Sequence, residues 1–95
     1  MPTPISQSSA ELEKFLGRYQ INHDEERLIT FEGGKLYSQR GVGNKLEIIP
    51  FEENKFYFAF APLIQLHFES NVKGEISGVA FVMRFDSKEF AAKLG

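Results

Sequence analysis

The chain has 95 residues, a formal net charge of −2, ten Phe, and neither Cys nor Trp. This length makes one domain, and a chain without Cys has no disulfide and no Cys-ligated metal. The Lys and Arg residues are scattered rather than gathered in a basic stripe, which argues against a nucleic-acid partner. No apolar run reaches the roughly 20 residues of a membrane-spanning helix.

The N-terminal residues 1–7 are predicted to be a disordered linker or the start of an expressed fragment, followed by a single β-barrel domain over residues 8–95. Pro2 and Pro4 oppose a helix in this segment. It also lacks the charged and apolar regions of a signal peptide.

A short helix is predicted over residues 9–16. Ser8 to Glu11 has the pattern of a capping box, and Gly17 suits the C-terminal end of the helix. Since so short a helix is unstable by itself, we expect its apolar face to dock on one end of a barrel. That face consists of Leu12, Phe15 and Leu16.

Strand patterns separated by turn signals fill the rest of the chain. The Gly33-Gly34 pair suits a two-residue hairpin turn, Pro50 indicates an edge or a bulge, and Gly78 a bend. The succession predicts an all-β fold, a small eight-stranded antiparallel up-and-down (lipocalin-like) barrel with a short N-terminal helix. The predicted strands cover residues 18–22, 27–32, 35–40, 45–51, 55 up to a break at Pro62, 63–69, 75–85 and 90–94.

The centre of the predicted core is residues 55–69, in which apolar and other residues alternate on both sides of Pro62. Successive strand residues point to opposite faces, so the apolar residues should share one buried face. They are Phe56, Phe58, Phe60, Ile64, Leu66 and Phe68. Residues 75–85 add Val79, Phe81, Met83 and Phe85 to the predicted core by the same rule.

Three short motifs resemble catalytic or binding signatures without their required context. Residues 23–26, His-Asp-Glu-Glu, lie at a predicted hairpin tip, where four consecutive residues cannot supply a zinc site. Residues 41–43, Gly-Val-Gly, lack the third glycine and the βαβ context of a phosphate loop. Residues 70–73 spell S-x-x-K in a predicted hairpin loop rather than at a helix start. With His67 expected on the surface, we predict no catalytic, cofactor-binding or metal-binding residues, and no enzyme.

A candidate interaction surface arises from the same alternation. Tyr37, Ile49, Phe51 and Tyr57 would face away from the buried Phe residues. A contiguous apolar patch on the outside of a small domain is typical of a contact surface. The alternative is that bulges or the N-terminal helix cover these residues.

Several segments have a recognisable spacing of glycine, proline and apolar residues. They are Leu12 with Leu16-Gly17-Arg18-Tyr19, Gly33 to Tyr37, Ile48-x-Pro50 with Phe56, and Ile64 to Phe68 with Gly74 to Val79. These spacings resemble a family of small lipocalin-like C-terminal domains of unknown function, which follow β-lactamase-related serine hydrolases and some peptidases. The resemblance covers residues 12–94, and its motifs are mostly structural. The loop at residues 41–44 departs from it, because it lacks the polar Gln/Pro-rich run often found there.

The resemblance implies a non-catalytic accessory or interaction domain from the C-terminus of a larger hydrolase or peptidase, located outside the cytoplasm. Its partner would be the parent catalytic domain or a second copy of the chain. The alternative is a lipocalin-like module that binds a small apolar ligand, because an eight-stranded barrel either fills with side chains or holds one such ligand. Ten Phe residues favour a filled interior.

Overall fold

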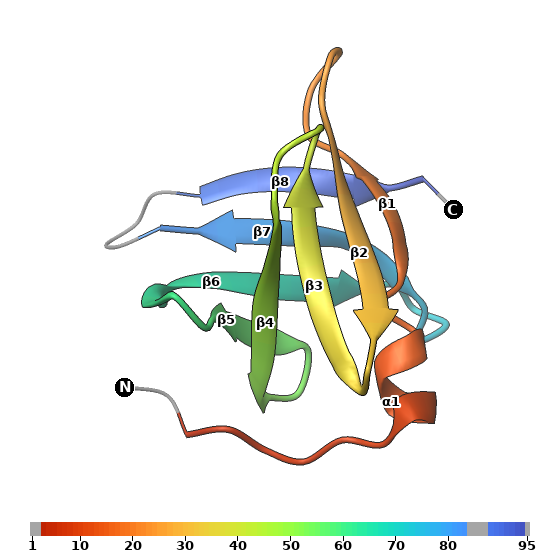
Figure 1. Cartoon of the computed structure of the whole chain (residues 1–95). Coiled ribbons are helices and arrows are strands. Elements are labelled where there is room, and N and C mark those ends of the chain that lie inside the picture. The colour runs from red at the N-terminus through yellow and green to blue at the C-terminus, as the bar shows by residue number, and fades with distance from the viewer. Residues whose placement is uncertain (1–2, 84–87, 95) are drawn as a thin grey trace.

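A computed structural model describes residues 3–83 and 88–94 and shows a closed barrel of eight antiparallel strands in sequential order. The predicted fold class, with its short N-terminal helix, is therefore confirmed (Figure 1). The elements are α1 (Ser9–Glu13), β1 (Gly17–Gln20), β2 (Glu26–Glu32), β3 (Lys35–Arg40), β4 (Lys45–Glu52), β5 (Lys55–Phe58), β6 (Ala61–Ser70), β7 (Ile76–Val82) and β8 (Lys88–Lys93). Phe85, which is predicted to share the core face, lies outside the described residues.

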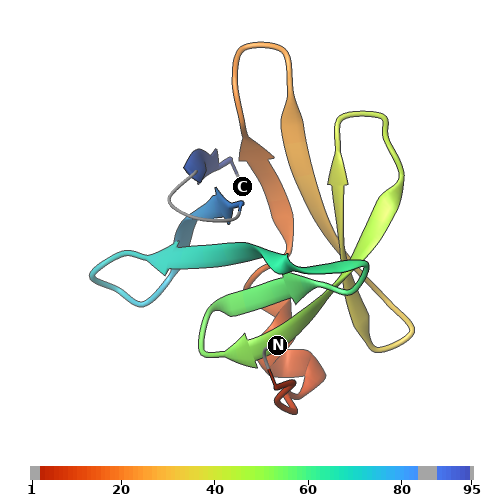
Figure 2. The same ribbon diagram turned by 90° about the vertical axis from the view of Figure 1, so that its left-hand side faces the viewer.

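The connections between the strands alternate between the two ends of the barrel, since the strands run up and down in order. The β2–β3, β4–β5 and β6–β7 connections share one end with α1. The β1–β2, β3–β4 and β5–β6 connections share the other, which we call the distal end. Both views place the β1–β2 and β3–β4 connections away from α1 (Figures 1 and 2).

The helix is capped as predicted but is shorter than predicted. The backbone N–H of Glu11 donates to Ser8 Oγ, and that of Ser8 donates to the Glu11 carboxylate. The helix ends at Glu13 with Lys14 as its C-cap. Gly17 therefore does not cap the helix; it begins β1, with a φ of 138° that favours glycine.

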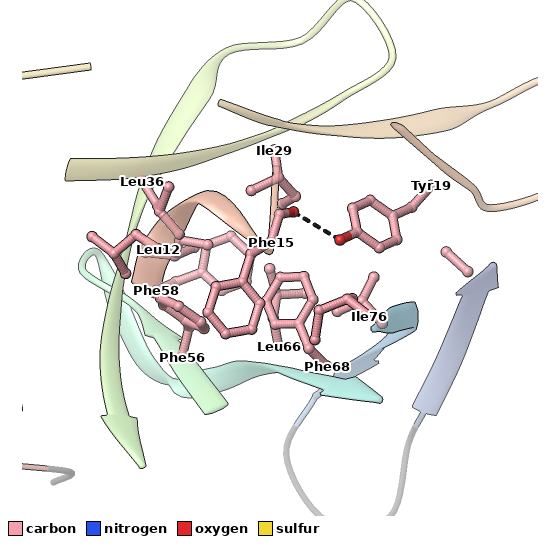
Figure 3. Packing of buried hydrophobic residues seen from close by; sticks show 13 residues of the cluster. Leu12, Phe15, Tyr19, Ile29, Leu36, Phe56, Phe58, Leu66, Phe68 and Ile76 are labelled. Carbon is pink, nitrogen blue, oxygen red and sulfur yellow. Dashed lines mark hydrogen bonds between the residues drawn. The ribbon is translucent and has the colours of Figure 1, made fainter. Parts of the chain in front are cut away.

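The core forms where the helix meets the barrel interior (Figure 3). Phe15 is fully buried, and its ring centroid lies 5.0 Å from that of Phe56 and 4.7 Å from that of Phe68. The Tyr19 hydroxyl donates to the Phe15 carbonyl oxygen at 2.7 Å, and burial raises the pKa of this phenol. Leu12 is also buried, so the predicted docking of the helix is confirmed.

Residues 55–69 supply the buried face as predicted at Phe56, Phe58, Leu66 and Phe68. Ile64 is only partly buried against the core. Phe60 is 65% exposed, so its predicted burial is wrong. Strand β5 ends at Phe58, and Ala59 and Phe60 form the turn to β6, where the alternation no longer applies.

The other predicted glycine and proline positions have identifiable structural roles. Gly33 and Gly34 have φ of 56° and 83°, as the predicted primed turn requires. The predicted bulge near Pro50 is present as a register shift between Pro50 and Glu52. Gly78 lies beneath the ring of Phe90, with which a Cβ at position 78 would collide.

The N-terminal segment lies against the barrel. The backbone N–H of Ile5 donates to the Pro50 carbonyl oxygen at 2.9 Å. Residues 5–7 therefore line an external hollow together with Lys35, Leu36 and residues 47–50. In Figure 1 this segment runs below β4 toward α1.

Candidate functional site

The predicted interaction surface lies on three neighbouring strands. Ile49 in β4 is directly opposite Tyr57 in β5, and the rings of Phe51 and Tyr57 have centroids 5.9 Å apart. Tyr37 lies in β3 opposite Glu47. Tyr37, Ile49 and Phe51 are half-buried, whereas Tyr57 is only 6% exposed. Ile49, Phe51 and Tyr57 therefore lie together, but Tyr57 is a packed residue among them rather than an exposed one.

We expect Tyr57→Ser to lower the unfolding free energy by ~2–4 kcal/mol, because it removes a buried ring from contact with Phe51. The matched variant Tyr37→Ser, at a half-buried position, should cost less than half as much. Urea unfolding of both variants measures this difference. Equal losses, or a loss below about 1 kcal/mol at Tyr57, would contradict the packed role of its ring.

The distal end carries a second and more exposed apolar surface. Phe60 is 65% exposed and Leu63 is 71% exposed, and both flank the β5–β6 turn. Met83 follows β7 and is 42% exposed, although its predicted place was on the core face. Val42 and Leu46 are exposed on and beside the β3–β4 connection. We call Phe60, Leu63 and Met83 the distal apolar rim.

An apolar groove lies within this rim. It has a volume of about 330 Å³ and is lined by Ala61, Pro62, Leu63, Ile64 and Met83. Next to it, the ring of Phe58 lies 5.8 Å from the ring of Phe60 and 5.8 Å from that of Phe81. An aromatic path thus leads from the exposed turn into the barrel.

A buried cation lies at the inner end of that path. Arg27 is 4% exposed; its Nη1 donates to Ser38 Oγ at 2.7 Å, and its guanidinium carbon lies 4.8 Å from the centroid of Phe81. Loss of hydration lowers the pKa of Arg27 to about 10, and the nearby positive charge of Arg40 acts in the same direction. The Glu89 and Glu25 carboxylates oppose this shift. Arg27 therefore remains a cation at neutral pH.

Arg40 binds two carboxylates whose charges also act on Arg27. Its Nη2 lies 3.0 Å from Glu25 Oε1, and its Nη1 lies 3.1 Å from Glu89 Oε1. The hydrogen bond from Arg40 holds the pKa of Glu25 below its usual value, and the same bond raises the pKa of Arg40. These three side chains join the β1–β2 connection to β3 and β8.

Sequence reasoning missed Arg27, although a signal was present. The predicted strand over residues 27–32 places Ile29 and Phe31 on one face, and a period of two adds Arg27 to that face. Ile29 is 1% exposed in the core, so its neighbour on that face also points inward.

The short motifs occupy ordinary turns. In residues 23–26, the backbone N–H groups of Asp24 and Glu25 donate to Asn22 Oδ1. Residues 41–43 lie in the β3–β4 connection. Of residues 70–73, Ser70 ends β6 and the other three lie in the β6–β7 connection. His67 Nε2 lies 2.8 Å from Gln65 Oε1. Among the described residues, no three His, Asp or Glu side chains are grouped as metal ligands.

Comparison with known proteins finds no protein-family model and no curated protein that matches this chain. Within residues 3–83 and 88–94, no helix has the length and apolarity needed to cross a membrane.

Proposed function

We propose that this chain is a non-catalytic interaction domain and that it binds its partner through the distal apolar rim. The observation that carries this proposal is the exposure of Phe60 and Leu63 beside an apolar groove. Exposed apolar patches on small domains are typical of contact surfaces. The rim exposes its aromatic and aliphatic side chains more fully than the half-buried cluster at Tyr37, Ile49 and Phe51.

The partner that fits the family resemblance is the catalytic domain of a larger β-lactamase-related hydrolase or peptidase outside the cytoplasm; a second copy of the chain is the other candidate. Either partner would cover Phe60 and Leu63 and remove their apolar area from water, at roughly 25 cal/mol per Å². Exposed aromatic side chains of this kind act as anchors when they fill a partner's pocket.

We expect the double variant Phe60→Ser/Leu63→Ser to change the unfolding free energy by less than about 1 kcal/mol, because both side chains are mostly exposed. It should weaken self-association of the chain, or binding to the parent catalytic domain, by at least about tenfold. Sedimentation equilibrium measures both associations. Val72→Ser is the matched control, since Val72 is fully exposed in the β6–β7 connection at the opposite end.

Two results would count against the rim as the binding surface. One is that the wild-type chain associates with neither partner. The other is that the double variant associates as tightly as the wild type, in which case the cluster around Phe51 should be tested by Phe51→Ser.

A second candidate function is the binding of a small apolar ligand at the distal end. The aromatic path Phe60–Phe58–Phe81 favours it, because this path links the groove to the barrel interior. At the helix end, by contrast, Phe15, Tyr19, Phe56 and Leu66 are fully buried against one another. A ligand would therefore bind at the distal end rather than at the barrel centre.

A further inference from the structure

We propose that the distal end binds an amphipathic anion, a medium-chain aliphatic carboxylate, with its carboxylate between Arg27 and Arg40 and its tail along Phe81 toward the groove. This inference rests on the second candidate function and adds the charge of the ligand to it.

The first argument is the burial of Arg27. Arginines are rarely buried this fully unless they are paired with an anion, because the lost hydration of the charge must be replaced. Within the described residues, the partners of Arg27 are a neutral hydroxyl, Ser38, and the face of the Phe81 ring. No carboxylate of those residues lies within 4 Å of its guanidinium. Its charge is thus less well compensated than that of Arg40.

The second argument is the position of Arg40. Arg27 in β2 and Arg40 in β3 are directly opposite each other, an arrangement that is unfavourable for like charges. A carboxylate between them would relieve the repulsion and accept hydrogen bonds from both guanidinium groups, the geometry that arginine favours. It would share or replace the contacts that Glu25 and Glu89 now make with Arg40.

The local charge also permits an anion to enter. Arg27 and Arg40 carry two positive charges, and Glu25 and Glu89 carry two negative charges, so these four groups sum to zero. Arg40 is the accessible member of the arginine pair, with its side chain 40% exposed. The incoming carboxylate would reach Arg40 first and Arg27 beyond it.

The third argument is the apolar surface that begins at Arg27. The guanidinium stacks over Phe81, which contacts Phe58, which in turn contacts Phe60 beside the groove. A ligand with a carboxylate at Arg27 would therefore lie along the partly buried ring of Phe81 and end among Leu63 and Met83. One amphipathic molecule matches both features.

The test measures binding of decanoate, decanol and decyltrimethylammonium to the full chain by titration calorimetry. Decanoate should bind about tenfold or more tightly than decanol, because hydrogen bonds to charged groups are stronger than those between neutral groups. Decyltrimethylammonium should bind more weakly than decanol. In Arg27→Met, decanoate should lose its advantage while decanol binding is kept. Arg18→Met is the control, since Arg18 is exposed on β1 and should leave all three affinities unchanged.

A spectroscopic measurement keeps the inference testable if Arg27→Met does not fold. In the wild-type protein, the side-chain Nε–H resonance of Arg27 should shift with decanoate and not with decanol. If decanol binds as tightly as decanoate, the ligand site stands and the anionic assignment is overturned. If neither decanoate nor decanol binds, this inference and the second candidate function both fail. An unchanged advantage of decanoate in a folded Arg27→Met variant overturns the role of Arg27.

Discussion

Replacing Phe58 by alanine is expected to lower the unfolding free energy by ~3–5 kcal/mol, as truncation of a buried aromatic side chain does. Phe58 is 2% exposed and contacts the ring of Phe81 inside the barrel. The interior at this position is lined by rings and aliphatic side chains that cannot all move to fill the space. Since small domains have a total stability of about 5–15 kcal/mol, this one change could remove much of it.

The neighbouring residue Phe60 provides the matched control for this experiment. It has the same side chain, lies two residues away and contacts the Phe58 ring, yet it is 65% exposed. Phe60→Ala should cost less than about 1 kcal/mol. Urea unfolding of both variants gives the comparison, and similar losses for the two would show that β5 does not end at Phe58 as described.

Replacing Phe15 by alanine is expected to lower the unfolding free energy by a similar amount, ~3–5 kcal/mol. The change removes the side chain that packs the segment after α1 against the barrel core. Phe15 is fully buried, and its ring contacts those of Phe56 and Phe68 at the helix end of the core. A helix of five residues has little stability of its own, so its position depends on this side chain and on Leu12.

Hydrogen exchange and unfolding measurements should both detect the loss of helix packing. In Phe15→Ala, and more strongly in a chain that begins at Arg18, amides of the strands beneath α1 should exchange faster and an apolar dye should bind. Lys14→Ala is the control, because this exposed residue contributes a cation–π contact, 5.1 Å from the Phe15 ring centroid, worth about 0.5–1 kcal/mol. If exchange and dye binding stay at the wild-type level on truncation, the helix is only a tether.

The sequence by itself determined the elements of this fold and their order. Alternation over residues 27–32, 35–40 and 45–51 indicated strands that the structure contains within a residue or so, because the side-chain period of a strand is a local property. The capping box at Ser8 and the Gly33-Gly34 turn were equally local, since each depends on hydrogen bonds or φ values within a few residues.

The tertiary structure alone decided which faces and ends became the candidate site. Alternation predicted burial for Phe60, which is wrong because β5 stops at Phe58. It also predicted exposure for Tyr57, which is wrong because the Tyr57 ring packs against Phe51. The pairing of Arg27 with Arg40 depends on the register of β2 against β3. The contact of Arg40 with Glu89, which is 49 residues away in the sequence, depends on closure of the barrel. A period of two indicates that residues share a face, but only the closed sheet determines whether that face is filled, covered or open to a partner.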